Sequence, residues 1–244
     1  MSSYNQRTVT LLLPTLNEVD GIRKIFPLID KSLVDDILIV DGGSTDGTVE
    51  FAIENNIRIM SQIRKGLSEG VSDAISTLKT DCVIEFSLDG NCMVEQLPEL
   101  VERLKQGYDV VVVSRYLPPA KSYDDGIITA FGNFMFTRMI RWLGKFPITD
   151  SLTIYRGFDI NVTKLPEFQR CLYGPVFEPL ISAVAAARNL KVFEIPGDEP
   201  ARIGGVSKMS VTYNGSCILL MIVRMYWFKW FGCKKIRGVI NELS

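Results

Sequence analysis

The 244-residue sequence contains no histidine. Histidine is the commonest general base and a frequent metal ligand, so its absence removes the usual serine-hydrolase triad and histidine-rich metal sites from consideration. We therefore expect acid–base or metal chemistry to use carboxylates. Cysteine is also scarce: the five cysteines lie far apart, and no two form a Cys-x-x-Cys pair. This pattern argues against a disulfide framework and a zinc site, and it indicates a reducing compartment.

An excess of charge and a signal peptide are lacking as well. The formal net charge is −1 and the isoelectric point is about 5.7, so the sequence has no basic footprint of the kind that grips nucleic-acid backbones. The first seven residues are polar and lead directly into an apolar run, unlike a secretory signal. We expect a cytoplasmic protein that does not bind nucleic acid.

The hydrophobic pattern that is present predicts alternating strands and helices. Such alternation is typical of right-handed βαβ units around a mostly parallel sheet. With 47% hydrophobic residues, a single α/β domain of this length buries a substantial core. The predicted strands cover 8–13, where Pro14 ends the run, 37–40, 57–60, 82–86 and 108–113; the predicted helices cover 17–29, 48–55, 66–78, 98–105, 131–146 and 217–237. Residues 117–126 are rich in turn formers and predict a mobile surface loop.

An acidic loop follows the predicted strand 37–40: Asp41-Gly42-Gly43-Ser44-Thr45-Asp46-Gly47-Thr48. Loops at the carboxyl ends of strands form the ligand crevice of an open α/β sheet. The Asp41 carboxylate can accept hydrogen bonds from a nucleobase or ribose there, while the glycines let a ligand come close. Alternatively the loop is a turn and helix cap. A cap accounts for Ser44 to Thr48 but leaves Asp41 without a structural task.

A second acidic loop, Asp89-Gly90-Asn91, follows the predicted strand 82–86. Its two oxygen-bearing side chains stand two residues apart on a tight turn, so both can point toward one cation. Magnesium and manganese prefer oxygen ligands and commonly complete their shell with ligand phosphates. An Asp-x-Asn pair alone is weak support for a metal, but its position after a strand strengthens it.

Cations and further carboxylates occupy other predicted loops. Arg115 follows the strand 108–113, and Arg202 and Lys208 lie in a glycine-bearing stretch. Guanidinium and ammonium groups at such places suit phosphate oxygens, although surface cations are usually solvated and idle. Asp150 and Glu178 are further candidates for the same crevice, or helix caps.

Two segments, 131–146 and 217–237, combine aromatic and aliphatic residues with arginine and lysine. The second has charges inside an apolar run that is too short to cross a bilayer. Basic, aromatic amphipathic helices can lie in the membrane interface. Equally, both helices can pack on the core and keep their cations at the surface.

Taken in chain order, these motifs resemble the family-2 glycosyltransferases of the A-type fold. The branch they resemble most contains the dolichol-phosphate mannosyltransferase and related polyprenyl-phosphate glycosyltransferases, and the resemblance spans about residues 8 to 210. The motifs are Leu13-Pro14-Thr15-Leu16-Asn17-Glu18, Asp41 to Thr48, Gly66 to Gly70, Asp89-Gly90-Asn91, Ser114-Arg115-Tyr116, Asp150 to Gly157 and Arg202 to Lys208.

The resemblance implies a nucleotide-diphosphate sugar donor, a divalent cation (Mg²⁺ or Mn²⁺) and inversion at the anomeric carbon. It implies that Asp89 and Asn91 hold the metal, and that Asp150 lies near the acceptor. Asp150 would be a base only for a hydroxyl acceptor, because a phosphate acceptor already carries charge. The implied nucleotide-sugar site comprises Pro14, Leu16, Glu18, Asp41, Gly43, Ser44, Gly66 and Asp89, with Arg115, Arg202 and Lys208 on the diphosphate or acceptor phosphate.

Three departures from the family pattern bear on this transfer of roles. Leu16 stands where an aromatic residue is frequent, which weakens base stacking. Asn91 replaces a second aspartate and removes one negative charge from the metal site. An arginine that the polyprenyl-phosphate branch tends to carry before residue 131 is missing around Ile127-Ile128, and this weakens the case for a lipid-phosphate acceptor.

Together these features predict an inverting, metal-dependent hexosyltransferase that uses a GDP- or UDP-linked sugar and a polyprenyl phosphate at the inner membrane face. Two alternatives stay open: the same fold acting on a saccharide hydroxyl, and a non-catalytic nucleotide-binding member. A nucleotidyltransferase is disfavoured because residues 11–25 lack its glycine-rich, lysine-bearing phosphate loop. We expect a catalytic domain over 1–210, with a nucleotide-sugar half (1–112) and an acceptor half (113–210), followed by an amphipathic basic segment (211–244).

Overall fold

Seven strands form one mixed sheet in the order β3-β2-β1-β4-β6-β5-β7. The computed structural model describes residues 6–203 and 210–240, the last ten by backbone alone. β6 runs antiparallel to β4 and β5, and the other neighbouring strands are parallel. The strands are β1 (Val9–Thr15), β2 (Asp36–Asp41), β3 (Arg58–Ser61), β4 (Cys82–Glu85), β5 (Val110–Ser114), β6 (Arg156–Asp159) and β7 (Val192–Pro196).

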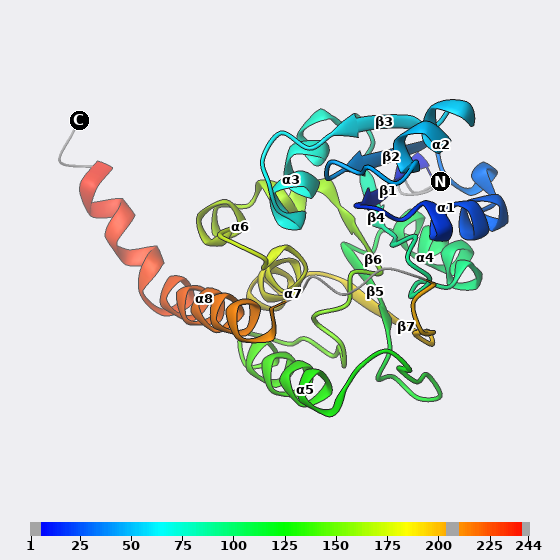
Figure 1. Cartoon of the computed structure of the whole chain (residues 1–244). Coiled ribbons are helices and arrows are strands. Elements are labelled where there is room, and N and C mark those ends of the chain that lie inside the picture. The colour runs from blue at the N-terminus through cyan, green and yellow to red at the C-terminus, as the bar shows by residue number, and fades with distance from the viewer. Residues whose placement is uncertain (1–5, 204–209, 241–244) are drawn as a thin grey trace.

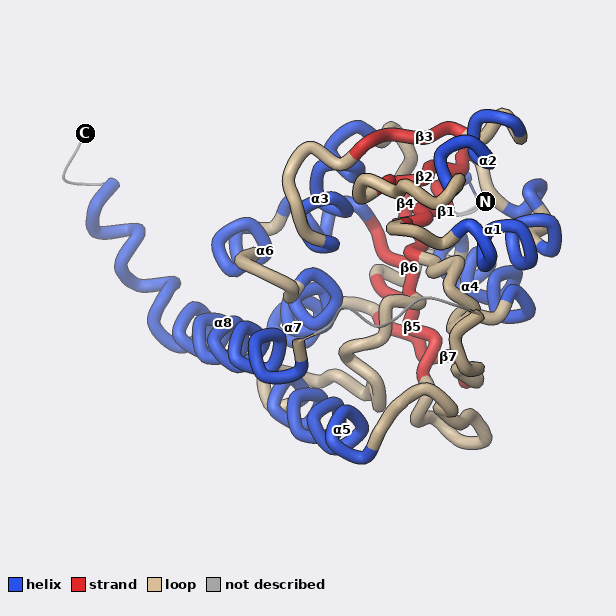
Figure 2. Tube along the Cα trace, viewed as in Figure 1, coloured by secondary structure: helices blue, strands red, loops and turns tan. Residues whose placement is uncertain are grey.

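Helices cover both faces of this sheet (Figures 1 and 2). One layer contains α1, α2 and α4, which share a buried cluster with the sheet; the other contains α3, α5, α6, α7 and α8. The helices are α1 (Val19–Ile25), α2 (Thr48–Glu54), α3 (Leu67–Thr77), α4 (Leu97–Lys105), α5 (Ile127–Arg141), α6 (Pro166–Cys171), α7 (Phe177–Arg188) and α8 (Val211–Ile240), with short 3₁₀ turns η2 (Phe26–Leu28), η3 (Lys31–Leu33), η4 (Val94–Gln96) and η5 (Ile160–Lys164).

The central strands are apolar at successive positions because both faces of the sheet are covered. In β5, Val110 and Val112 join the cluster on the α7 side, whereas Val111 and Val113 join the cluster on the α4 side. This two-residue alternation is the side-chain period of a strand. The valine run of β5 is therefore buried on both sides, as its sequence predicts.

The predicted fold class is confirmed, but the sequence analysis missed β6, β7, α6 and α7 and placed the end of β1 too early. The sequence suggests that Pro14 ends the strand, but β1 continues to Thr15 and Pro14 pairs in register with Val40 of β2. The Thr15 carbonyl bonds toward β2, at Gly42, so the nitrogen of Pro14 faces the β4 side. Pairing with β4 ends at Leu12 in the strand register, and the missing N–H of proline therefore breaks no ladder bond.

The two amphipathic segments form helices with shifted boundaries. The segment predicted at 131–146 is α5, which begins at Ile127 and ends at Arg141, and the segment predicted at 217–237 lies within α8. α8 buries Ile218, Met221, Ile222 and Met225 in the core and packs on α5, α6 and α7. Within the described residues, no helix combines the length and apolar character needed to cross a membrane.

Candidate active site

A cavity of about 1670 Å³ opens where the parallel strands end. Its walls come from the loops after β1, β4, β5 and β7, and from the first residues of α3, α5, α7 and α8. Elements that are far apart in the sequence therefore meet at one edge of the sheet, as expected for an open α/β fold. The cavity lining includes the predicted site residues Pro14, Leu16, Glu18, Gly66, Asp89, Asn91, Arg115 and Arg202, and also Glu178.

Asp41 has a structural task that the sequence does not reveal. Its carboxylate accepts hydrogen bonds from the backbone N–H groups of Gly43 (2.9 Å) and Ser44 (3.2 Å). The side chain is nearly buried, and Asp41, Gly43 and Ser44 are not part of the cavity lining. The view that Asp41 lacks a structural role is thus wrong, because it holds its own loop in shape.

The loop after β2 is also tied to the loop after β1. The Ser44 hydroxyl accepts from the backbone N–H of Asn17 at 2.9 Å, and the Asn17 side-chain oxygen accepts from the backbone N–H of Thr45 at 2.8 Å. The Thr48 hydroxyl accepts from the backbone N–H of Glu18 at 3.0 Å. These reciprocal bonds fix Leu16 and Glu18 at the cavity wall, where Leu16 keeps 37% of its surface exposed. An apolar surface there can contact a ligand ring, as the sequence predicts for this position.

The predicted metal pair lies at the cavity wall, where Arg202 reaches one of its two side chains. Gly90 adopts a left-handed φ of 100°, and the resulting turn lets the Asp89 carboxylate accept from the backbone N–H of Asn91 at 3.1 Å. A guanidinium nitrogen of Arg202 lies 3.1 Å from the other Asp89 oxygen. Arg202 also donates to Asp124 at 3.0 Å, and the Asn91 amide donates to the same Asp124 oxygen at 3.0 Å.

The donor set of this turn fits a divalent cation in part. The Asn91 side-chain oxygen is buried and has no hydrogen-bond partner among the described residues, and an orphaned amide oxygen beside a carboxylate suits a hard cation. Within the described residues, no three acidic or cysteine side chains gather in a way that could hold a metal. A cation here would therefore need further oxygens from water or from bound phosphates, as is common for Mg²⁺ and Mn²⁺.

Arg115 is enclosed by carboxylates. It donates from Nε to Asp150 at 2.7 Å and from a terminal nitrogen to the second Asp150 oxygen at 3.1 Å. Its other terminal nitrogen contacts Asp125 at 3.1 Å and Glu199 at 3.2 Å. Every nitrogen of Arg115 is thus engaged, which differs from the expectation that this guanidinium is free to bind a phosphate.

Asp150 is completely buried behind Arg115. Burial acts to raise the pKa of its carboxyl group, but the adjacent Arg115 guanidinium and its hydrogen bonds outweigh burial and lower the pKa overall. A carboxylate that is inaccessible, bidentately paired and of lowered pKa is a poor proton acceptor. The geometry favours a positioning role for Asp150, in place of the base that the sequence suggests for a hydroxyl acceptor.

The Arg115 cluster also organises the loop 117–126. Tyr116 donates its phenol to Asp125, and Ser122 donates its hydroxyl to Glu199. The backbone N–H of Lys121 donates to the Asp198 carboxylate at 2.8 Å. The loop lies beside the cavity, which Asp124 and Asp125 help to line. The mobility of this loop stays a prediction.

A buried charged group beneath the cavity is missed by the sequence reasoning. Arg156 of β6 is fully buried and donates to the Glu178 carbonyl at 2.6 Å and to the Ser182 hydroxyl at 2.9 Å. Glu85 of β4 pairs with it in register, and neither Glu85 carboxyl oxygen has a hydrogen-bond partner. Burial raises the pKa of Glu85 well above its ordinary value. A charged residue between Tyr155 and the apolar Phe158 is the only sequence signal for this group.

Glu178 connects this buried group to the cavity. It stands in the first turn of α7, lines the cavity, and has one carboxyl oxygen that is buried without a partner among residues 6–203 and 210–230. Burial raises its pKa, against the opposing effect of Arg156. A carboxyl group of raised pKa that faces a cavity is suited to exchange a proton with a ligand. Glu178 is therefore a better acid–base candidate than Asp150.

The structure thus places most of the predicted site residues around one cavity. Asp41, Gly43 and Ser44 lie behind the wall as loop supports, and Asp150 lies behind Arg115. Lys208 falls outside the described residues. The remaining predicted residues line the cavity itself.

Comparisons with known proteins identify similar chains. The sequence profile of "Glycosyl transferase family 2" matches residues 10–160. A dolichyl-phosphate hexose transferase of Haloferax volcanii is 25% identical over 92% of this chain and 96% of its own length. An undecaprenyl-phosphate mannosyltransferase of Micrococcus luteus is 25% identical over 86% of this chain and 91% of its own length.

A solved structure with the same fold is glucosyl-3-phosphoglycerate synthase of Mycobacterium tuberculosis, in complex with Mn²⁺, UDP-glucose and phosphoglyceric acid. It superposes with a TM-score of 0.63 and 21% sequence identity, and the match covers 90% of this chain and 80% of that one. The likeness supports the A-type fold that the motif order implies.

Proposed function

Since the chain belongs to glycosyl transferase family 2, we propose that it transfers a hexose from a nucleotide-diphosphate sugar to a polyprenyl phosphate, with a divalent cation and inversion at the anomeric carbon. The family and the full-length relatives named above support a transferase of polyprenyl-phosphate type. The sugar, the metal, the acceptor and the stereochemistry are part of the proposal.

The donor would occupy the part of the cavity between the loops after β1 and β4. Leu16 and Glu18 would face the nucleoside, and the first residues of α3, including Gly66, form the adjoining wall. Asp41 would act indirectly, by holding the loop whose bonds fix the β1 loop. The Mn²⁺ and UDP-glucose in the glucosyl-3-phosphoglycerate synthase structure support a donor and cation of this kind.

The cation would be held by Asp89 and Asn91, with the remaining oxygens supplied by the donor diphosphate. When bound, it would neutralise the charge that develops on the departing diphosphate. Arg202, which keeps part of its side chain exposed, would exchange its contact with Asp89 for a phosphate oxygen. Arg115 would keep its carboxylates and hold the loop 117–126 against the cavity.

The observation that most favours a lipid acceptor is the apolar mouth of the cavity. Ile127 and Ile128 of α5 line it and are 90% and 75% exposed, and Val211 and Tyr213 of α8 line it with 46% and 56% exposed. Large apolar side chains so exposed at the entrance of a polar cavity suit the hydrocarbon tail of a lipid acceptor. The two isoleucines give this entrance an aliphatic surface for the hydrocarbon chain, whereas the arginine missing near them counts against phosphate binding at this point.

A phosphate acceptor also agrees with the chemistry of the site. Its oxygen is already charged, so attack on the anomeric carbon needs positioning and charge stabilisation more than a base. The buried Asp150 carboxylate offers no accessible base. The basic, apolar faces of α5 and α8 would bring the enzyme to the inner face of the membrane as a peripheral protein of the cytoplasm.

Glu178 supports a second candidate function, transfer to a saccharide hydroxyl. Such an acceptor must lose a proton, and the Glu178 carboxyl, with its raised pKa and orphaned oxygen, faces the cavity. In that case Glu178→Gln would abolish transfer, and the wild-type rate would fall in acid, as the pH drops through the raised pKa of Glu178. With a phosphate acceptor, the same variant would retain most of its activity.

A transfer assay tests both candidates. Donors with GDP or UDP are offered, with Mg²⁺ or Mn²⁺, to a short-chain polyprenyl phosphate and to an oligosaccharide. The expected result is transfer to the lipid phosphate that is lost in Asp89→Ala and kept in Asp20→Ala, a matched removal of an exposed carboxylate on α1. Transfer to the oligosaccharide alone would establish the second candidate.

The non-catalytic alternative has its own signature in that assay. Tight nucleotide binding with no transfer to either acceptor, for the wild type as well as for Asp89→Ala, would favour a binding protein. Equal transfer by wild type and Asp89→Ala would instead refute the role of the metal.

A further inference from the structure

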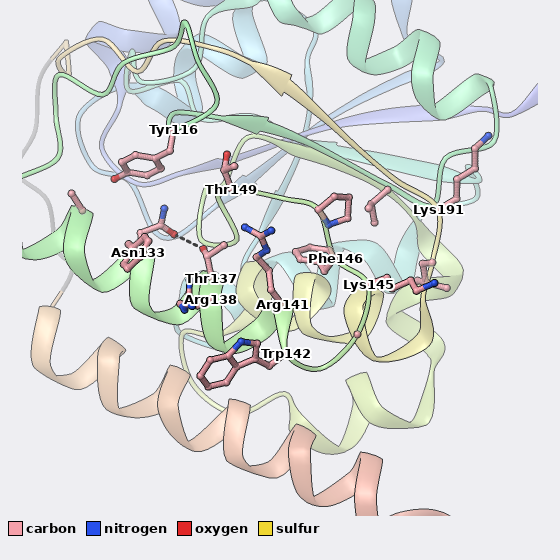
Figure 3. Close-up of a pocket in the computed structure, with 16 residues that line it drawn as sticks. Tyr116, Asn133, Thr137, Arg138, Arg141, Trp142, Lys145, Phe146, Thr149 and Lys191 are labelled. Carbon is pink, nitrogen blue, oxygen red and sulfur yellow. Dashed lines mark hydrogen bonds between the residues drawn. The ribbon is translucent and has the colours of Figure 1, made fainter.

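A second cavity, of about 1000 Å³, lies alongside α5 and is separate from the candidate active site (Figure 3). One wall is the middle and end of α5, and the other walls are the segment 144–149 and residues 190–192 at the start of β7. The first turn of α5, by contrast, lines the candidate active site. α5 therefore borders both cavities.

The lining of this second cavity is cationic. Arg138, Arg141 and Lys145 line it, and its lining contains no aspartate or glutamate. None of the three cations makes an ion pair with a carboxylate among the described residues. Figure 3 shows the Arg141 side chain extending into the cavity toward Thr149. This concentration of unpaired positive charge favours an anionic occupant.

The neighbouring charges do not neutralise this cluster. Glu194 of β7 lies behind Thr149 and already accepts from its backbone N–H and its hydroxyl, both at 2.7 Å. Lys191 also lines the cavity, but its ammonium donates to the Gln106 carbonyl at 3.3 Å. Arg138 and Arg141 lie in the last turn of α5, where the negative end of the helix dipole stabilises cations. The dipole does not explain why Lys145, beyond the helix, lines the same space.

An unsatisfied hydrogen-bond donor points to the same occupant. Asn133 is 2% exposed and lines the cavity, and its amide nitrogen is buried without a partner in the part of the chain that the structure describes. Its amide oxygen accepts from the Thr137 hydroxyl at 3.3 Å, and Figure 3 shows the nitrogen pointing away from that bond. Buried donors are nearly always paired, so this amide is suited to an acceptor oxygen that enters the cavity.

The rim of the cavity is aromatic and faces solvent. Phe134 and Trp142 line it with 62% and 67% of their surfaces exposed, and Phe131 of the same helix is 65% exposed. α8, which packs beside α5, exposes Trp227 and Trp230 at 65% and 72%. Exposed tryptophan and phenylalanine beside arginine is the composition of a helix that lies at a membrane surface.

From these observations we infer that the cavity beside α5 binds the phosphodiester headgroup of an anionic glycerophospholipid. The Arg138 and Arg141 guanidinium groups and the Lys145 ammonium neutralise the headgroup, and the Asn133 amide donates to a phosphate oxygen. Phe134 and Trp142 enter the interfacial layer. This site is distinct from the proposed acceptor site, because the two cavities share no lining residue. The lipid held here would not be consumed in the reaction.

Headgroup binding here would orient the candidate active site. Tyr116 and Thr149 line the second cavity, and they directly adjoin Arg115 and Asp150 in the sequence. A bilayer that contacts the exposed side of α5 also lies near Ile127 and Ile128 at the mouth of the first cavity. The mouth through which the proposed lipid acceptor enters would then face the membrane.

The test is binding of the full chain to vesicles of phosphatidylcholine with and without phosphatidylglycerol. We expect binding only with phosphatidylglycerol, and Arg138→Gln/Arg141→Gln should weaken it about 30-fold, from the usual contribution of a cation near an anionic surface. The matched control, Arg23→Gln/Lys24→Gln, removes two cations from α1 in the other helical layer (Figure 1) and should change binding less than about twofold.

Asn133→Leu separates a built site from general attraction, because it removes the buried donor without changing charge. It should weaken binding at least about tenfold, the lower end for one hydrogen bond to a charged group, while circular dichroism and melting temperature confirm that each variant folds. Equal weakening by the α1 control, or unchanged binding of Asn133→Leu, would overturn the inference. If inorganic phosphate binds the protein but does not displace it from the vesicles, the conclusion that the site takes a lipid headgroup would also be overturned.

This inference does not depend on the acceptor proposed above. Headgroup-dependent vesicle binding without transfer to polyprenyl phosphate would refute the proposed function alone. Transfer to a short-chain acceptor without headgroup-dependent binding would refute the headgroup site alone.

Discussion

The Arg115–Asp150 pair gives the sharpest test of the candidate site. Asp150 is fully buried, and both its oxygens accept from Arg115, at 2.7 and 3.1 Å. It also accepts from the backbone N–H groups of Leu152 and Thr153 at 3.2 Å each. Asp150→Ala removes all of these bonds and leaves the Arg115 charge without its best partner.

The expected cost follows from the surroundings of Arg115. Breaking one half of a buried ion pair costs about 3–5 kcal/mol, and the lower end applies because Asp125 and Glu199 remain within 3.1 and 3.2 Å of Arg115. At about 2–4 °C per kcal/mol for a protein of this size, the melting temperature should fall by about 6–12 °C. Asp36→Ala is the matched control, because its pair with Arg58 is exposed and should contribute about 0–1 kcal/mol.

The effect should also depend on pH in a defined direction. The pKa of Asp150 is lower in the folded state than its ordinary value of 3.8. Stability from the ionised carboxylate is therefore present above about pH 4 and is lost as the pH falls through the folded-state pKa. The difference between wild type and Asp150→Ala should shrink in acid.

Calorimetry or thermal melting of Arg115→Ala, Asp150→Ala and the double variant completes the test. Groups that act as one unit should show a coupling energy of about 2 kcal/mol or more. Additivity within about 0.5 kcal/mol, or an Asp150→Ala melting temperature no lower than that of Asp36→Ala, would refute the reasoning. A base role would instead appear as lost transfer with unchanged stability and donor binding.

Three other predictions follow from the site. Saturating Mn²⁺ should raise the melting temperature by roughly 5–10 °C at a hundred times its dissociation constant, and Asp89→Asn should abolish this shift. Arg202→Gln should strengthen Mn²⁺ binding in the absence of nucleotide, because it removes the competing guanidinium at 3.1 Å from Asp89. Glu85 has a raised pKa, so it ionises in the unfolded chain above about pH 4.5 while it stays protonated in the folded protein, and stability falls as the pH rises toward the folded-state pKa. Glu85→Gln should therefore lose less stability between pH 5 and pH 8 than wild type, and an unchanged pH profile in urea titrations would contradict this. Ile127→Ser/Ile128→Ser should raise KM for a long-chain polyprenyl phosphate about tenfold, for two lost apolar contacts, and leave KM for the donor unchanged. Equal changes in both constants, measured by steady-state kinetics, would argue against a path for the polyprenyl chain along this rim.

The sequence alone determined β1 to β5, α1 to α5 and α8, and their order, because strand and helix periodicities are local properties that each segment carries in itself. It did not predict β6, β7, α6 or α7. It also identified the loops that supply Leu16, Asp89 and Arg202, since ligand loops follow the carboxyl ends of parallel strands. The antiparallel β6, which no local period distinguishes from a parallel strand, came only from the structure.

Only the tertiary structure decided what the polar residues do. Whether Arg115 binds a phosphate or three carboxylates depends on Asp125, Asp150 and Glu199, which the fold brings together from 10, 35 and 84 residues away. Burial, which the fold alone creates, makes Asp150 a support for Arg115 and gives Glu178 its raised pKa. The absence of histidine directs the chemistry to carboxylates, but only packing determines which carboxylate is paired and which is accessible.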